Sequence, residues 1–219
     1  PRLFDSVFTM TVKEGDIRLN PRELGGGTLY DIGIYCINAV RNLYGAEPME
    51  VVAFSANNGD PRFLQCEETT SAILRFPGRE RLASFTCSFG AADVSNYRVV
   101  GTEGDLVLEP AYEYAGELKQ WVTVNGRTRE RSFPKRDQFA PELIHFSECI
   151  STGAEPEPSG WEGLADVRVI RALYRSADSG QPVTLEPFDK YTQRPALDQE
   201  IRRPAVPKPE LINTEAPSE

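Results

Sequence analysis

The chain has few of the residues that build common metal and nucleic-acid sites. It contains one histidine, His145, and four cysteines, none of them in a C-x-x-C pair, so clustered zinc ligands are missing from the sequence. Its 24 lysines and arginines are outnumbered by 33 aspartates and glutamates, which leaves a net charge of −9. Such a chain does not offer phosphates a broad basic surface. We therefore expect no metal and no nucleic-acid partner.

Long apolar runs and nucleotide-binding glycine motifs are also missing. No stretch approaches the roughly 20 apolar residues of a membrane helix, so we expect no membrane partner. The sequence has neither the Gly-Lys-Ser/Thr of a P-loop nor a G-x-G-x-x-G motif. The cysteine spacings do not resemble a disulfide framework, and four buried thiols predict a reducing compartment such as the cytoplasm. The chain begins at Pro1 without a signal-like segment and looks cut from a longer sequence. A targeting signal upstream would then not be visible, so a periplasmic location stays open.

Strand patterns dominate the first two thirds of the chain. With 219 residues it can form one large domain or two small ones. Apolar and polar residues alternate in 68–76 and 82–89, which indicates strands with one packed and one polar face. Further strands are expected at 2–13 and 49–57, and Asn125-Gly126 is a strong hairpin signal. We predict an α+β fold with a mostly antiparallel, open-faced sheet and helices packed on one face.

Helical periodicity appears in three places. Apolar residues recur at helical spacing in 28–44, 137–153 and 161–180. After Glu186 repeated prolines interrupt the chain, which is typical of an extended segment. We therefore predict a main domain over 1–186 and a Pro-rich C-terminal arm over 187–219.

The first helix follows three glycines and carries two stripes. Thr28 is a plausible N-cap and Gly45 a plausible C-terminal stop. One stripe is apolar, and the other is polar with short or rigid hydrogen-bonding side chains where a plain solvent face would carry Lys and Glu. The polar stripe consists of Asp31, Tyr35, Asn38 and Asn42. From the residues alone, a solvent face and a functional site both stay open.

The same segment resembles the start of the C-terminal domain of the glucose–fructose oxidoreductase (Gfo/Idh/MocA) family of NAD(P)-dependent dehydrogenases. The family pattern has three glycines, then Leu-x-Asp-x-Gly, a His or Tyr two residues later and an Asp or Asn three further on. The matching residues are Gly25, Gly26, Gly27, Leu29, Asp31, Gly33, Tyr35 and Asn38. GTEGDLVLE and the helix at 161–179 resemble later family segments. The likeness is strongest over residues 1–58 and weak beyond 186.

The resemblance implies a substrate-binding and oligomerisation domain from a two-domain enzyme. Its Rossmann domain, with a catalytic lysine, would lie outside this sequence. The intact parent would be an oxidoreductase that moves a hydride between NADP or NAD and a sugar or polyol. The isolated chain would be inactive and would hold no cofactor by itself. A homo-oligomer through the sheet face is also implied.

The resemblance also implies roles for five residues. Asp31 would orient the substrate hydroxyl or tune the absent lysine, and Tyr35 would transfer or hold the proton. Arg22 and Asn38 would bind substrate hydroxyls, and Gly26 and Tyr35 would contact the cofactor. Since a free tyrosine has a pKa of about 10, work as a base would need a neighbouring cation to lower that pKa.

Two readings from other classes compete with the enzyme. The alternating strands between Glu67 and Phe89 suit a non-catalytic assembly module that joins subunits through its open face. A free-standing carbohydrate-binding module is the third reading, and it predicts sugar affinity in the isolated chain.

Overall fold

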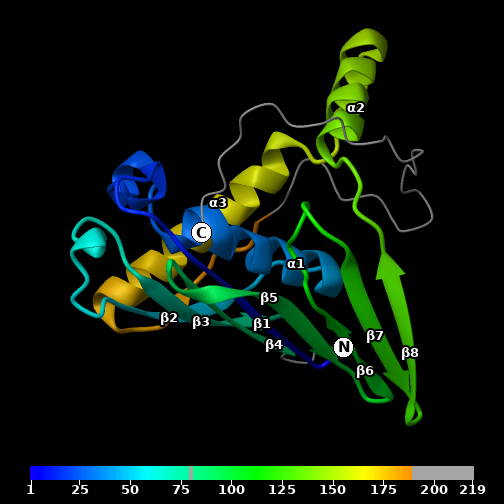
Figure 1. Cartoon of the computed structure of the whole chain (residues 1–219), viewed down its shortest axis with the longest axis horizontal. Helices are drawn as coiled ribbons and strands as arrows, with labels where there is room; N and C mark the ends of the chain where they lie inside the picture. The colour runs from blue at the N-terminus through cyan, green and yellow to red at the C-terminus, as the bar shows by residue number, and fades with distance from the viewer. Residues whose placement is uncertain (79–80, 189–219) are drawn as a thin grey trace.

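The computed structural model of the protein describes residues 1–78 and 81–188, which contain a nine-stranded sheet (Figure 1). The strands lie side by side in the order β8-β7-β6-β5-β1-β4-β3-β2-β9. Their bounds are β1 Leu3–Thr11, β2 Glu50–Ala56, β3 Thr69–Phe76, β4 Arg81–Ser88, β5 Gly90–Val100, β6 Gly104–Leu108, β7 Leu118–Val124, β8 Arg127–Phe133 and β9 Val183–Thr184.

The sheet is mostly antiparallel, as predicted. The exception among its described neighbouring pairs is β1–β4, which is parallel and pairs Leu3 with Leu82 and Thr9 with Ser88. Parallel neighbours need a long crossover between them. Here the crossover includes helix α1 (Ile34–Tyr44), β2 and β3, so β1 ends up in the interior of the sheet beneath α1.

Helices α1 and α3 (Gly160–Ser179) lie over the same face of the sheet (Figure 1). Apolar side chains of β1, β3 and β4 point toward this face and alternate with mostly polar residues on the other, as expected for half-buried strands. α1 ends at Gly45, whose φ of 58° is the left-handed conformation that glycine adopts without strain. The core between the two layers includes Phe4, Phe8, Phe85, Leu74, Ile32, Ile37, Val40, Ile170 and Leu173.

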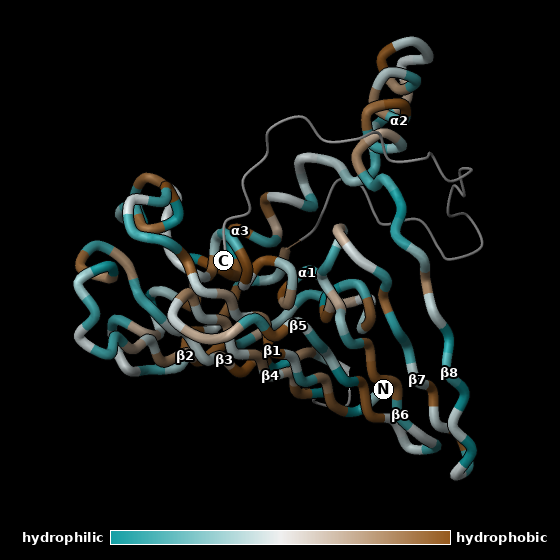
Figure 2. Tube along the Cα trace, viewed as in Figure 1, coloured by the Kyte–Doolittle hydropathy of each residue, from teal (hydrophilic) through white to brown (hydrophobic). Residues whose placement is uncertain are grey.

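Helix α2 (Phe139–Thr152) departs from the prediction of helices packed on the sheet. It follows the edge strand β8 and stands away from the sheet (Figure 1). Figure 2 shows hydrophobic and hydrophilic residues alternating along it. Its apolar stripe is exposed because no sheet face lies beneath the helix. The exposed residues are Phe139, Leu143, Ile144, Phe146 and Ile150.

The predicted hairpin and the predicted free cysteines are both confirmed. The Asn125-Gly126 turn joins β7 to β8. All four cysteines are buried free thiols. Residues 189–219, which hold most of the predicted C-terminal arm, lie outside the described residues. Among the described residues, no helix combines the length and apolar character needed to cross a bilayer.

Candidate functional site

The helix with the polar stripe begins as a π-helical turn at Leu29–Gly33 and continues as α1. Thr28 holds the N-cap position, as predicted, but its backbone angles are already helical and its side chain makes no capping hydrogen bond. The carboxylate of Glu67, from the segment before β3, supplies the acceptor instead. Its Oε1 accepts the Thr28 N–H at 2.7 Å and the Thr28 hydroxyl at 2.9 Å. A side chain distant in sequence therefore caps this helix.

Glu67 also binds two further groups and fills the space at the helix N-terminus. Its Oε1 accepts the Tyr174 hydroxyl at 2.9 Å, and its Oε2 accepts Nε–H of Arg22 at 2.9 Å. A helix N-terminus usually favours an anion, and here a carboxylate of the chain itself occupies that position. The site after the glycines therefore does not fit the phosphates of a dinucleotide.

Gly26, predicted to contact a cofactor, lies against the chain's own backbone. A Cβ at this position would lie 1.9 Å from the carbonyl oxygen of Asn20, so only glycine allows the two segments to approach so closely. This packing accounts for the glycine without a ligand. A cofactor contact at Gly26 stays a prediction.

Asp31 lies in the π-helical turn and is held by an arginine. Nε of Arg18 donates to Oδ2 of Asp31 at 2.7 Å, and Nη1 of Arg18 lies 3.3 Å from Oδ1 of Asp16. Burial lowers the pKa of Arg18, but the hydrogen bonds and charges of Asp31 and Asp16 outweigh it and raise that pKa overall. Arg18 therefore stays protonated, and the pair presents an oriented carboxylate at the surface.

Tyr35 lies one helical turn beyond Asp31 and is 47% exposed. Its ring forms a T-shaped pair with that of Phe8, with 5.5 Å between centroids, and lies 5.9 Å from the ring of Tyr112. The Tyr112 hydroxyl is itself hydrogen-bonded to Ser6, 2.8 Å away, which fixes this aromatic support. Burial first, and then the charge of Asp31, raise the pKa of Tyr35, while Arg18 lowers it less. The net pKa is raised, so Tyr35 keeps its proton at neutral pH.

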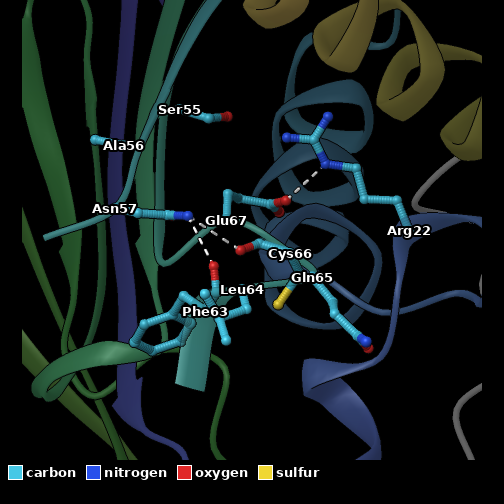
Figure 3. A pocket seen from close by; sticks show the side chains of 9 residues that line it. All are labelled: Arg22, Ser55, Ala56, Asn57, Phe63, Leu64, Gln65, Cys66 and Glu67. Carbon is cyan, nitrogen blue, oxygen red and sulfur yellow. Dashed lines mark hydrogen bonds and ion pairs between the residues drawn. The ribbon is translucent and has the colours of Figure 1, made fainter. Parts of the chain in front are cut away.

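Arg22, expected to bind substrate, makes two ion pairs within the chain, and its substrate-binding role stays a prediction. Its Nε bonds Glu67, its Nη1 bonds Asp178 at 2.9 Å, and its guanidinium lies 4.5 Å above the ring of Tyr174. The side chains of Arg22 and Glu67 both line a hollow of about 360 Å³. Figure 3 shows the two pointing toward each other there. Neither Asp31 nor Tyr35 lines that hollow. These contacts tie the loop before the helix to α3.

Asn38, the other expected substrate ligand, joins a buried charge cluster. Its Nδ2 donates to Asp166 of α3 at 2.8 Å. Asp166 also pairs with Arg41, whose guanidinium is bonded to Glu47 and Glu162 as well. The cluster joins α1 to α3. The structure therefore brings Asp31 and Tyr35 together on one face and places Arg22 and Asn38 in structural contacts elsewhere.

Sequence reasoning missed three residues of this region. Arg18 lies in the loop before the glycines, Glu67 between two strands, and Tyr112 between β6 and β7. No periodic pattern connects these positions to Asp31. One usable signal was Asp16-Ile17-Arg18, an N-cap followed by an arginine, in a loop close to a predicted site.

Comparisons with known proteins agree with the family resemblance seen in the sequence. A family model described as "Oxidoreductase family, C-terminal alpha/beta domain" matches residues 13–185. A D-xylose 1-dehydrogenase (NADP(+)) of Haloarcula marismortui is 32% identical over 169 residues, which make up 77% of this chain and 47% of that protein. The chain thus spans about half the length of the curated relatives it matches.

Two solved structures share the fold. An aldose-aldose oxidoreductase from Caulobacter crescentus, complexed with glycerol, has a TM-score of 0.75 and 37% identity over 84% of this chain and 55% of its own. KijD10, a 3-ketoreductase from Actinomadura kijaniata in complex with NADP and TDP-benzene, has a TM-score of 0.70 and 25% identity, over 80% and 53% of the two chains.

Proposed function

This chain belongs to the Gfo/Idh/MocA oxidoreductase family as a C-terminal α/β domain, and we propose that the whole protein is an NADP-dependent dehydrogenase of a sugar or polyol. NADP is preferred to NAD because the names of the relatives above carry it. In this proposal a nucleotide-binding domain outside the present sequence holds the dinucleotide. The chain in hand supplies the substrate side of the site.

The observation that carries the proposal is the shared face of Asp31 and Tyr35. Both side chains are accessible and lie one turn apart. Asp31 is paired with Arg18, and the Tyr35 ring rests on a fixed aromatic support. This is an arrangement that holds a hydroxyl group by two hydrogen bonds in a defined direction.

The chemistry of the chain's own residues follows from their charge states. The Asp31 carboxylate accepts a hydrogen bond from a substrate hydroxyl and orients the carbon that bears it. Tyr35 keeps its proton, so it donates a hydrogen bond to the reacting oxygen, and in carbonyl reduction it is placed to give that proton up. When bound, the nicotinamide supplies the hydride acceptor or donor.

The isolated chain is proposed to be inactive. Its glycine segment is closed by Asn20 and Glu67, so it does not fit the cofactor's phosphates. At the open face, Tyr35 can contact at most the nicotinamide end of the cofactor. Dinucleotide binding would then require the rest of the protein.

The experiment is an activity assay of the intact protein with NADP⁺ and a panel of aldoses and polyols. NADPH formation is expected with at least one of them, with loss in Tyr35→Phe and retention in Tyr44→Phe, a change at the far end of α1. Sugar binding without NADPH formation would favour the carbohydrate-binding alternative, and neither binding nor turnover would favour a pure assembly module.

A second role in assembly is favoured by the open face of the sheet. Phe54, Ile73 and Leu82 lie on neighbouring strands and are 68%, 48% and 44% exposed. Clustered apolar side chains on an exposed sheet face mark a contact surface. We propose that copies of the protein associate through this face, which is compatible with catalysis elsewhere on the domain.

A further inference from the structure

Two loops of the chain contain the same Asp-x-Arg motif. In Asp16-Ile17-Arg18 and Asp60-Pro61-Arg62, the aspartate precedes a short 3-10 turn, Ile17–Leu19 or Pro61–Phe63. In both, the aspartate accepts the arginine's backbone N–H at 2.9 Å. The local backbone is therefore matched, and the two guanidinium groups can be compared directly.

The two arginines use their guanidinium groups differently. Arg62 turns back onto its own aspartate, with Nε 3.0 Å and Nη2 2.7 Å from Oδ2 of Asp60, and its Nη1 donates to the Val12 carbonyl. Arg18 contacts Asp16 only at 3.3 and 3.4 Å through Nη1. Its shortest bond, 2.7 Å from Nε, goes to Asp31.

The Arg18 contact affects the orientation of the Asp31 carboxylate more than the stability of the fold. The Arg18 and Asp31 side chains are 29% and 31% exposed, so their attraction adds little to the free energy of folding. A planar guanidinium held on one side by Asp16 nevertheless fixes the direction of the carboxylate it bonds. Arg18 also offsets the charge of Asp31 beside Tyr35.

We propose that Arg18 is a positioning residue, braced by Asp16, that holds the Asp31 carboxylate in its working orientation beside Tyr35. The inference rests on the proposed dehydrogenase function and assigns to Arg18 a task that Arg62 does not have. The charged or titratable groups that act on Tyr35 are Asp31, Arg18 and Tyr114, and the neighbouring rings are Phe8 and Tyr112.

The test compares Arg18→Met with Arg62→Met in the intact enzyme with NADP⁺ and its best aldose. Loss of a partner that orients a metal ligand typically costs about 10–100-fold in activity. By analogy, kcat of Arg18→Met should fall by about 10–100-fold, with the KM for NADP⁺ unchanged. Arg62→Met should keep wild-type turnover. Arg18→Lys, which keeps the charge but not the planar fork, should recover part of the loss.

A double-mutant cycle separates positioning from a general structural effect. If Arg18 acts through Asp31, Arg18→Met should cost little in the Asp31→Asn background. An equal cost in both backgrounds, or equal losses in the Arg18 and Arg62 variants, would overturn the inference while leaving the dehydrogenase function intact.

A second readout needs no substrate. The titration of Tyr35 is followed as the tyrosinate absorbance of a protein minus that of the same protein carrying Tyr35→Phe, in the wild-type and in the Arg18→Met background. Arg18→Met should move this titration to higher pH, because the cation that lowers the Tyr35 pKa is gone while Asp31 remains. An unchanged titration would overturn the inference, and an inactive wild type that still shows the shift would remove only the proposed function.

Discussion

Oε1 of Glu67 lies 2.7 Å from the backbone nitrogen of Thr28, at the start of the helix that carries Asp31 and Tyr35. Glu67 is only 2% exposed and gathers donors from three separate segments of the chain. A buried carboxylate is tolerated when such donors surround it. The position of the candidate site therefore depends on a residue 39 positions from Thr28 in sequence.

Removal of the Glu67 carboxylate should destabilise the domain. In Glu67→Ala the Arg22 guanidinium, the Thr28 N–H and the Tyr174 hydroxyl lose a shared acceptor, with an expected loss of about 3–5 kcal/mol in the free energy of unfolding. Urea denaturation measures it. Glu23→Ala, at an exposed position in the same region, should change it by no more than about 0.5 kcal/mol. Similar midpoints for the two variants would contradict this role.

Asn38 should affect stability more than substrate binding. Asn38→Ala removes a donor to Asp166 and should cost about 1 kcal/mol, while the KM for the sugar stays at the wild-type value. Asn42→Ala, at an exposed position of the same helix, is the control and should leave the free energy of unfolding unchanged. A raised KM with unchanged stability in Asn38→Ala would instead support the substrate-binding role expected from the resemblance.

Tyr35 should act in its protonated form. Burial and Asp31 raise its pKa above the ordinary value of about 10, so the group binds its proton more tightly in the folded than in the unfolded chain. Its contribution to stability is complete below about pH 10 and is lost as pH rises through the folded-state pKa.

Carbonyl reduction should follow the same titration. Tyr35→Phe keeps the ring on Phe8 but should lower kcat by about 10²–10⁴-fold. In the wild type, the rate should stay level through neutral pH and fall only above about pH 10, as the proton is lost. A pH–rate profile of both proteins checks this, and a rate that rises with deprotonation near neutral pH would contradict it.

The open sheet face should mediate self-association. Ile73→Lys places a charge among exposed apolar residues on neighbouring strands and should shift the protein toward the monomer in sedimentation velocity. Ser132→Lys, on the exposed edge strand β8, should leave the assembly unchanged. A wild-type protein that sediments as a monomer at high concentration would rule out this interface.

Local chemistry explains what the sequence could predict. Asn125 and Gly126 adopt positive φ angles of 51° and 74°, the conformation a tight hairpin turn between β7 and β8 demands. The strands expected at 68–76 and 82–89 appear at Thr69–Phe76 and Arg81–Ser88, because alternation reports a half-buried strand directly.

Long-range contacts explain what could not be predicted from the sequence. Thr28 is an acceptable N-cap residue by type, yet its cap comes from Glu67, and no local pattern announces that pairing. Helical periodicity likewise placed α2 but did not show whether anything covers its apolar stripe. Arg18 and Asp31 lie 13 residues apart across a glycine loop, so only the folded chain reveals their ion pair.

The most direct measurement follows hydrogen from substrate to cofactor. The intact protein is supplied with NADP⁺ and an aldose that carries deuterium on the carbon that is oxidised, and the NADPH formed is analysed by mass spectrometry. The proposed function predicts deuterium in the nicotinamide, and loss of that transfer in Tyr35→Phe. NADPH without deuterium, or sugar binding with no NADPH at all, would contradict the assignment of Asp31 and Tyr35 to a hydride-transfer site.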